Sequence, residues 1–272
     1  MSEEHGGFRY DDKRVLVVGC YSGMGESTAK IVHSLGAEVH GVDYKDPDFE
    51  LASFTSCDLR SKGEIESMLS SLQGPFDSVF YCAGLPPTHP AIDVMRVNVA
   101  AVRAVVEGVQ PLVPRGGAIS IISSTGGLGF FQHMQEIMEL LSTDGFDGAV
   151  EWCEQHADTV ADGYVFSKEV IIVYTMKRAL EIAEAGVRLN CISPGPTQTP
   201  MMPEFEAMSG AELLQKFEGP MKRKALPDEM GWPLAFLNSD AASFVNGFNL
   251  VIDGGFLAGT MTGAIDVAAL LA

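Results

Sequence analysis

Short apolar runs alternate with helical segments along most of the chain, and this alternation restricts the possible folds more than any other feature. Strands are expected at Val15–Gly19, Val39–Asp43, Phe54–Cys57, Val79–Cys82, Ala118–Ser123, Val187–Ser193 and Leu250–Ile252. The main helices are expected at Gly23–Leu35, Ser61–Leu72, Ile92–Leu112 and Asp162–Ala185. Because a parallel strand needs a helical crossover to return, the pattern predicts an α/β fold, a doubly wound parallel sheet of about seven strands with helices on both faces.

The length of 272 residues and the ordinary globular composition fit one large domain over residues 1–272. Acidic residues outnumber basic ones by 36 to 18, a formal charge of −18, which argues against nucleic acid or an anionic membrane as partner. The five cysteines show no metal-ligand spacing, so no metal site is expected. Met1–Asp12 is polar and no apolar run is long enough to span a membrane, so we expect a cytoplasmic protein.

Two segments are longer than ordinary connections, at about residues 130–161 and 198–228. Both should leave the sheet at the carboxyl ends of its strands, where ligands of such sheets bind. We therefore expect the first to be a helical insertion and the second a substrate lid. Their phenylalanines and methionines suit that role, although helices packed for stability or for subunit contact would have the same composition.

A glycine-rich turn follows the first expected strand, with Gly19, Gly23 and Gly25 in the spacing G-x-x-x-G-x-G. The missing side chains allow the backbone to approach a pyrophosphate, and the N-terminus of the following helix favours its negative charge. Asp43 ends the second strand, where its carboxylate can accept hydrogen bonds from ribose hydroxyls and would repel a 2′-phosphate. The sequence therefore favours NAD over NADP, although Lys45 lies close by.

Tyr164 and Lys168 are four residues apart in an expected helix, so both side chains project from one face. An isolated Y-x-x-x-K is weak evidence. Here it occurs with Asn98 in the long helix and Ser124 at the end of a strand, each in the order along the chain that an active site at the sheet edge requires.

Together these motifs make the chain similar to the short-chain dehydrogenase/reductase family, compact subtype, from about Lys13 to Gly255. The resemblance implies a single-domain Rossmann fold that binds NAD and transfers a hydride between nicotinamide and an alcohol or ketone. It implies a catalytic tetrad of Asn98, Ser124, Tyr164 and Lys168. It also implies cofactor contacts from Gly19, Ser22, Gly23, Met24, Asp43, Asp58, Leu59, Cys82, Ala83, Gly84, Tyr164, Lys168, Pro194, Gly195, Thr197 and Thr199.

The roles of these groups follow from the resemblance and from their chemistry. Asp58 and Leu59 would hold the adenine, and the segment from Pro194 to Thr199 the nicotinamide carboxamide. The Lys168 ammonium can lower the pKa of a neighbouring tyrosine by roughly 1 to 3 units, which would let Tyr164 act as the base. Ser124 would bind the substrate oxygen and Asn98 a water of a proton relay.

The chain departs from the family pattern in two places. Val18 stands where threonine is usual, and Tyr81–Cys82 replaces a pair of asparagines. Both changes remove hydrogen bonds that brace the central strands, and neither touches the proton-transfer groups.

The substrate is suggested by a subgroup likeness to bacterial hydroxysteroid dehydrogenases and carbonyl reductases, carried by Cys82–Leu85 and Gly219–Met221. We expect a bulky apolar secondary alcohol or ketone, alicyclic or steroid-like, with Phe130, Met134, Met201 and Phe205 as pocket walls. A homodimer or homotetramer is expected. The apolar tail, Phe256–Ala272, should pack on a neighbouring subunit or at the pocket mouth.

Two other functions are compatible with the fold. One is a non-catalytic NAD-binding sensor or scaffold, against which the complete tetrad argues. The other is enoyl reduction, dehydration or epimerisation on the same fold. Enoyl reductases of this fold usually separate the tyrosine and lysine by more than four residues, which makes that alternative weaker.

Overall fold

The computed structural model describes residues 8–266 and 270 of the chain. Its centre is one seven-stranded parallel sheet in the order β3-β2-β1-β4-β5-β6-β7. The strands are β1 (Arg14–Val18), β2 (Glu38–Asp43), β3 (Ser53–Ser56), β4 (Ser78–Tyr81), β5 (Ala118–Ile122), β6 (Arg188–Pro194) and β7 (Asn249–Ile252). The order reverses between β1 and β4, so the crevice for ligands opens at the carboxyl ends of these two strands.

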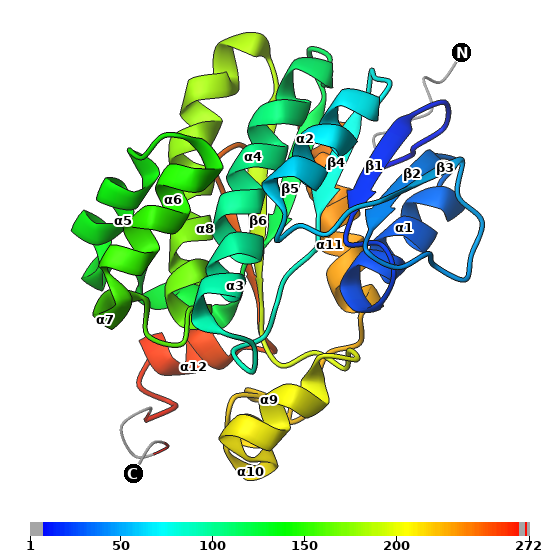
Figure 1. The fold of residues 1–272 in the computed structure, drawn as a ribbon. Coiled ribbons are helices and arrows are strands. Elements are labelled where there is room, and N and C mark those ends of the chain that lie inside the picture. The colour runs from blue at the N-terminus through cyan, green and yellow to red at the C-terminus, as the bar shows by residue number, and fades with distance from the viewer. Residues whose placement is uncertain (1–7, 267–269, 271–272) are drawn as a thin grey trace.

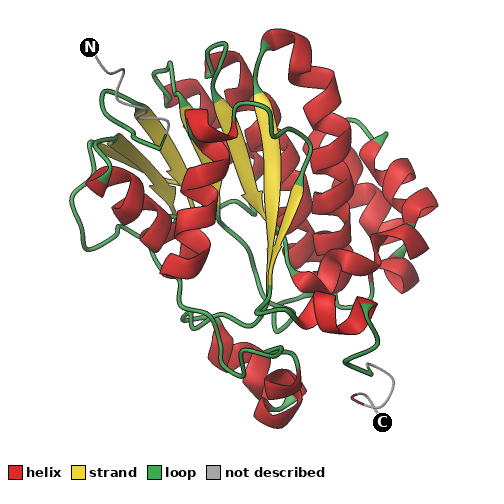
Figure 2. Cartoon of the chain, turned by 180° about the vertical axis from the view of Figure 1, so that it is seen from behind, coloured by secondary structure: helices red, strands yellow, loops and turns green. Residues whose placement is uncertain are grey.

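Helices cover both faces of the sheet, as the views in Figures 1 and 2 show. On one face lie α1 (Gly23–Ser34) and α11 (Asp228–Asn238), and on the other α2 (Lys62–Ser71), α4 (Ala101–Val109) and α8 (Tyr164–Ile182). The strand residues alternate accordingly: Val15 and Val17 belong to one hydrophobic cluster, and Leu16 and Val18 to the other. The expected fold class, an α/β Rossmann fold, is confirmed.

The long helix expected at Ile92–Leu112 is present and is continuous over residues 91–112, but it changes type along its length. It consists of α3 (Ala91–Met95), a π-helical turn (Arg96–Ala100), α4 and a 3-10 turn (Gln110–Leu112). A π turn adds a residue to the helical cycle and is frequent at functional sites. Periodicity alone cannot reveal it, because the apolar residues on either side still repeat at helical spacing.

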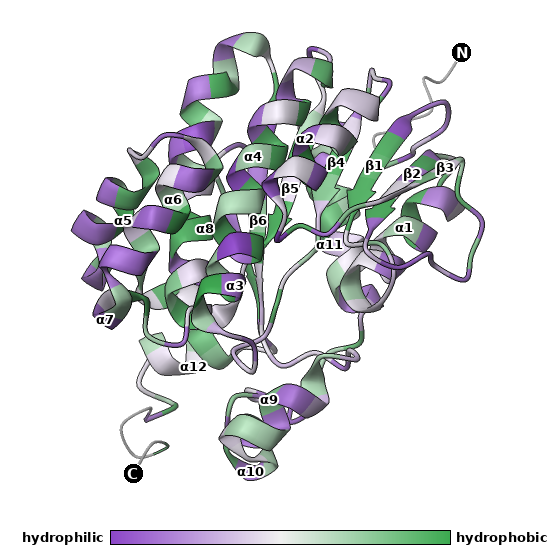
Figure 3. Ribbon diagram, viewed as in Figure 1, coloured by the Kyte–Doolittle hydropathy of each residue, from purple (hydrophilic) through white to green (hydrophobic). Residues whose placement is uncertain are grey.

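The first long segment begins as a 3-10 helix, η3 (Thr125–Gln132), and continues as α5 (Met134–Leu141), α6 (Gly145–Gln155) and α7 (Ala157–Val160). These helices pack beside α4 and α8 and contribute Ile137, Leu140 and Trp152 to the larger cluster. In Figure 3, β1 and β4 are mainly green, whereas α5 shows both purple and green along its length. The insertion is therefore a second layer over the helices of this face.

The second long segment forms α9 (Met202–Ser209) and α10 (Ala211–Lys216), which project below the sheet in Figure 1. Neither helix contains a buried residue. The final helix, α12 (Phe256–Met261), meets this arm through the rings of Phe256 and Phe217, whose centroids are 5.1 Å apart. The described part of the expected apolar tail thus packs on the arm, and residues 267–269 and 271–272 lie outside the described residues.

No helix in the described ranges, 8–266 and 270, has the length and hydropathy that a membrane span requires.

Candidate active site

A cavity of about 420 Å³ lies at the carboxyl ends of β1, β2 and β4. Of the cofactor contacts expected from the sequence, it is lined by Gly19, Ser22, Asp43, Asp58, Leu59, Cys82, Ala83 and Gly84. Sequence reasoning missed Tyr21, Tyr44, Arg60, Pro86, His89, Pro200 and Glu204, which also line it. Most of these residues are next to an expected residue in the chain, and that proximity in the sequence could have identified them.

The glycine turn brings three backbone segments into contact. A Cβ on Gly19, whose φ is +88°, would lie 2.4 Å from the nitrogen of Ala83. A Cβ on Gly25 would lie 1.8 Å from the carbonyl oxygen of Gly19. Only glycine allows α1 to start this close to β1 and β4. Gly23 faces Thr199, and Met24 packs into the smaller hydrophobic cluster.

The carboxylate of Asp43 is fixed at the rim of the cavity by backbone donors. The N–H of Tyr21 donates to Oδ2 at 2.9 Å, and the N–H of Tyr44 donates to Oδ1 at 2.7 Å. The Lys45 ammonium lies over both tyrosine rings, 5.3 and 5.1 Å from their centroids. Cation–π contacts with Tyr21 and Tyr44 thus hold the lysine beside the carboxylate.

Asp58 is held at the same edge by Arg60. The guanidinium donates to both carboxylate oxygens, with 2.6 Å between Nη2 and Oδ2, and this hydrogen bonding lowers the pKa of Asp58. The N–H of Asp58 donates to Glu64 Oε2 at 2.7 Å. The neighbouring Leu59 is buried, which leaves an apolar side chain between the polar ones.

Tyr164 is the first residue of α8, preceded by Gly163 at φ +82°. One turn later, the Nζ of Lys168 lies 5.5 Å from the centroid of the Tyr164 ring. The ammonium is buried and donates to the carbonyl oxygen of Ile122 at 3.3 Å. Burial lowers the pKa of Lys168 to about 8, because a charged ammonium is poorly solvated there.

Ser124 follows β5 and caps η3, where its Oγ accepts from the N–H of Gly126 at 3.1 Å. Its hydroxyl also acts on the nearby phenol of Tyr164 and lowers the pKa of that group. Burial nevertheless raises the pKa of Tyr164 to about 12, and Ser124 opposes this rise. The lowered tyrosine pKa expected from Lys168 is therefore not found: desolvation is the largest influence on the phenol, and the charge of Asp162 adds to the rise.

Asn98 sits in the π turn and is completely buried. Its Oδ1 accepts from the N–H of Leu85 at 2.8 Å, and its Nδ2 donates to the Leu85 carbonyl at 3.1 Å and to Ser167 Oγ at 3.2 Å. A Cβ on Gly84 would lie 3.3 Å from Asn98 Oδ1 and 3.6 Å from Lys168 Nζ. The structure thus brings Asn98 and Lys168 together beneath Gly84.

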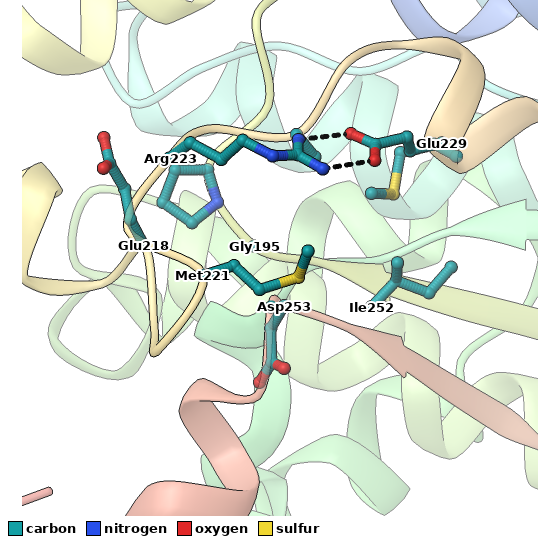
Figure 4. Close-up of a pocket in the computed structure, with 11 residues that line it drawn as sticks. Gly195, Glu218, Met221, Arg223, Glu229, Ile252 and Asp253 are labelled. Carbon is teal, nitrogen blue, oxygen red and sulfur yellow. Dashed lines mark hydrogen bonds and ion pairs between the residues drawn. The ribbon is translucent and has the colours of Figure 1, made fainter.

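The residues expected to hold the nicotinamide, Pro194, Gly195, Thr197 and Thr199, lie at the end of β6 and directly after it. Pro194 ends the strand, and the hydroxyl of Thr197 donates to the Gly195 carbonyl at 2.9 Å. Gly195 also lines a separate cavity of about 70 Å³. There Arg223 and Glu229 form two hydrogen bonds of 2.6 Å, which Figure 4 shows above the Met221 side chain. This smaller cavity marks the base of the α9–α10 arm.

The expected wall residues fall into two groups. The ring of Phe205 packs edge-on against Tyr164, with centroids 5.0 Å apart, and Met201 lines the larger cavity. Phe130 instead packs against the larger hydrophobic cluster, and Met134 is exposed. The arm, more than the helical insertion, therefore supplies the apolar surface beside Tyr164.

Tyr81, one of the departures from the family pattern, has its own bracing contact. Its buried hydroxyl donates to the carbonyl of Val97 in the π turn at 2.8 Å. The N–H of Cys82 donates to the Val18 carbonyl at 2.7 Å. A side chain larger than asparagine thus connects β4 to the helix that carries Asn98.

Comparisons with known proteins identify the family. The chain is 34% identical over 245 residues to coniferyl-alcohol dehydrogenase of Pseudomonas sp. (strain HR199 / DSM 7063), covering 90% of this chain and 96% of that one. It is 32% identical over 249 residues to 3-alpha-hydroxysteroid dehydrogenase/carbonyl reductase of Comamonas testosteroni, covering 89% and 95%. A family model described as enoyl-(acyl carrier protein) reductase matches residues 152–257.

Among solved structures, the 3-alpha-hydroxysteroid dehydrogenase of Pseudomonas sp. B-0831 in complex with NADH superposes with a TM-score of 0.80 at 25% identity, covering 93% of this chain and all of that one. Sequence, fold and the arrangement of the site agree with one another. The chain belongs to the short-chain dehydrogenase/reductase family of nicotinamide-dependent oxidoreductases.

Proposed function

We propose that this protein is an NAD-dependent dehydrogenase that interconverts a bulky apolar alcohol and its carbonyl compound. One observation carries the proposal: the Tyr164 ring lies beside the buried Lys168 and against the ring of Phe205, with the Ser124 hydroxyl near enough to act on the phenol. This places a proton donor and acceptor under an apolar surface, which is what oxidation of an apolar alcohol requires.

The residues at the sheet edge suit a dinucleotide. The cavity is lined at Gly19, Ala83 and Gly84 by residues with little or no side chain, so the backbone is open to a ligand there. Asp43 presents fixed carboxylate oxygens to a ribose and would repel a 2′-phosphate. Asp58 and Leu59 would hold the adenine. The solved relative in complex with NADH supports the same choice of cofactor.

The bound cofactor would supply or take the hydride at its nicotinamide ring. In carbonyl reduction Tyr164 gives its phenolic proton to the substrate oxygen, and in alcohol oxidation it takes that proton back. The hydroxyl of Ser124 donates a hydrogen bond to the same oxygen. Because the pKa of Tyr164 is raised to about 12, the phenol is protonated at neutral pH and is ready to act as the acid.

The substrate proposal rests on the apolar arm and on the names of relatives. Coniferyl alcohol, a 3α-hydroxysteroid, cyclohexanol and borneol are the alcohols named for four of them, and all contain carbon rings. Phe205 and Met201 offer matching surface beside Tyr164. An alicyclic or steroid-like secondary alcohol or its ketone is therefore the proposed substrate class.

Two alternatives make different demands on the site. A sensor or scaffold would bind NAD without needing the Ser124–Tyr164–Lys168 arrangement. An enoyl reductase is suggested by the description of the family model. However, Tyr164 and Lys168 lie on successive turns of α8, and Lys168 meets Asn98 at Gly84, an arrangement that suits proton transfer to a carbonyl oxygen.

The test is a spectrophotometric screen at the absorbance of reduced nicotinamide. Coniferyl alcohol, a 3α-hydroxysteroid, cyclohexanol and a sugar alcohol would each be tried with NAD and with NADP. We expect turnover of ring alcohols with NAD, and loss of turnover by about 10³-fold in Tyr164→Phe while NADH still binds. Tyr174→Phe is the matched control on the same helix, since the buried hydroxyl of Tyr174 has no hydrogen-bond partner among the described residues.

Three results would contradict the proposal: turnover of the sugar alcohol alone, preference for NADP, or full activity in Tyr164→Phe. Activity with an enoyl thioester and none with ring alcohols would favour the enoyl reductase.

We also propose a homo-oligomer in the cytoplasm. The outer edge of β7 has no neighbouring strand in the described sheet, and the side chains of Leu180, Phe244 and Phe248 near it are exposed. All five cysteines are free, which suits a reducing compartment. Light scattering on the purified protein would distinguish a dimer or tetramer from a monomer.

A further inference from the structure

A buried carboxylate follows Lys168 on α8 and has no part in the proposed proton transfer. The side chain of Glu169 is only 3% exposed. Its Oε2 lies 2.7 Å from Nδ1 of His133, at the start of the helical insertion. Burial raises the pKa of Glu169, and the contact with His133 opposes that rise. Since a buried carboxylate without a partner is strongly destabilising, His133 is what makes Glu169 tolerable at this position.

The pair joins α8 to the segment that carries Ser124. Ser124 caps the start of η3, and His133 follows its end. Between them η3 lies directly on α8, because a Cβ on Gly127 would be 2.5 Å from the carbonyl carbon of Lys168. The hydroxyl of Ser123 also donates to the Lys168 carbonyl at 2.7 Å.

Gly129, in the second half of η3, also lies close to Glu169. A Cβ on Gly129 would lie 3.1 Å from Oε1 of Glu169, so the carboxylate would have to shift by a few tenths of an ångström to admit it. The carboxylate is therefore placed between the backbone of η3 and the imidazole of His133. Contacts at the start, middle and end of η3 all fall on the turn of α8 that begins with Lys168.

We propose that His133 and Glu169 are positioning residues: their contact fixes the far end of η3 to α8 and so keeps the Ser124 hydroxyl aligned with the Tyr164 phenol. This rests on the proposed function, in which these two hydroxyls handle the substrate oxygen. The Ser124 hydroxyl is tied to η3 through the N–H of Gly126, so it moves when η3 moves. A displacement on the order of 1 Å at reacting groups can cost about 10²-fold in rate.

The rest of the insertion does not depend on this pair. The guanidinium of Arg103, on α4, donates to the Leu140 carbonyl and to both oxygens of Thr143, at 3.2, 3.0 and 2.7 Å. These bonds fix the end of α5 to the body of the protein. Loss of His133 should therefore loosen η3 without unfolding α5 and α6.

The experiment combines His133→Ala with Ser124→Ala. With NAD and the ring alcohol that gives the highest turnover, we expect His133→Ala to lower kcat roughly tenfold, or about 1.4 kcal/mol. The Kd for NADH should stay unchanged. In the Ser124→Ala background the same substitution should change kcat less than twofold, because there is no hydroxyl left to align.

Asp147→Asn is the matched control, since Asp147 and Lys62 form another ion pair between the insertion and the body, at 2.5 Å, but an exposed one. It should leave kcat at the wild-type value. His133→Asn, which restores a side-chain N–H donor, should recover most of the activity lost in His133→Ala. Glu169→Gln keeps the size and an acceptor oxygen, and should fall between the two.

Equal losses of kcat in the wild-type and Ser124→Ala backgrounds would overturn the proposal, as would full activity in His133→Ala. Hydrogen–deuterium exchange gives a readout that needs no turnover: His133→Ala should speed exchange in residues 125–132 at least tenfold and leave α6 unchanged. If the wild type oxidises no alcohol, the proposed function fails, whereas unaltered exchange in residues 125–132 refutes the positioning role itself.

Discussion

The two sides of the active-site edge are built in opposite ways. On the cofactor side, every residue of β1 from Val15 onward is buried, and the backbone at Gly19 lies against the backbone of β4. On the substrate side, neither α9 nor α10 has a buried residue. Two hydrogen bonds join the segment before α9 to the segment after α10. They run from Gln198 N–H to the Ala225 carbonyl at 2.8 Å and from Ala225 N–H to the Pro196 carbonyl at 2.9 Å.

This difference indicates which part of the site is fixed and which can adapt. Every substrate would react with the same dinucleotide, so the cofactor side can be made of backbone contacts that admit few alternatives. An apolar substrate needs only surface, which side chains such as Phe205 provide on an arm with few buried contacts. Segments of that kind open at low free-energy cost, as the admission of a bulky substrate requires.

The largest expected effect comes from adding a methyl group at Gly19. Gly19 and Gly210 both have positive φ, +88° and +82°, but a Cβ on Gly19 would strike Ala83 whereas one on Gly210 would meet nothing within 4 Å. Gly19→Ala should weaken NADH binding at least ~100-fold and destabilise the fold, while Gly210→Ala should cost only the local strain of about 1–2 kcal/mol. Fluorescence titration with NADH and thermal unfolding measure both. Similar losses of NADH affinity and of thermal stability in the two variants would show that the cofactor side is not packed more tightly than the arm.

Lys168 lies where the cofactor side and the substrate side meet, and its burial should make the free energy of unfolding depend on pH. The pKa of the folded-state ammonium, about 8, is below its ordinary 10.5, so between these values the unfolded chain binds more protons. The free energy of unfolding should therefore rise with pH in this window, by roughly 2 kcal/mol between pH 8 and 10. Lys168→Met should abolish this rise in urea denaturation curves.

Lys177→Met is the control for that titration. Lys177 lies on the same helix but is exposed and paired with Glu181. Its replacement should leave the slope of stability against pH intact. If the free energy of unfolding of the wild type does not change between pH 8 and 10, water reaches the Lys168 ammonium where the cofactor side and the substrate side meet.

The fold and the cofactor side could be predicted from the sequence because both rest on steric requirements. Buried parallel strands must be apolar throughout, and the turns at Gly19 and Gly25 exclude every side chain. Tyr164 and Lys168 could be predicted from their spacing, since residues four apart share a helix face. The strand ends were predicted to within one or two residues for the same reason.

Other features depend on packing between distant segments, which a local pattern does not record. The π turn at Asn98 interrupts a helix whose apolar period continues on both sides. The pKa of Tyr164 is raised by burial beneath several elements. The contact of Glu169 with His133 joins residues 36 positions apart, and Glu169 alone would read as a solvated charge.

Truncating Phe205 should separate binding of the two ligands. Its ring covers Tyr164, so Phe205→Ala removes apolar surface from the substrate and not from the dinucleotide. We expect the KM for a ring alcohol to rise roughly tenfold, as for loss of a partly buried aromatic contact, with the Kd for NADH unchanged. Met208→Ala on the same helix is the control, because Met208 is exposed. A larger change in NADH affinity than in KM would place Phe205 on the cofactor side.

The smallest expected effect concerns a hydrogen bond that crosses from one side to the other. The hydroxyl of Thr88, on the loop between β4 and α3, donates to the carboxylate of Glu204 on α9. Both residues are near the surface, so the bond should contribute only about 0.5–1 kcal/mol. Thr88→Val keeps the shape and removes the donor, which should let the arm open more often.

Dissociation of NADH, followed by stopped-flow fluorescence, should then be two- to threefold faster in Thr88→Val, with the KM for the alcohol nearly constant. Glu204→Gln keeps an acceptor oxygen for the Thr88 hydroxyl and should change the rate less. If Thr88→Val releases NADH at the wild-type rate, the arm is held over the cavity by the Phe205 ring, and the polar contact between the two sides does not limit cofactor exchange.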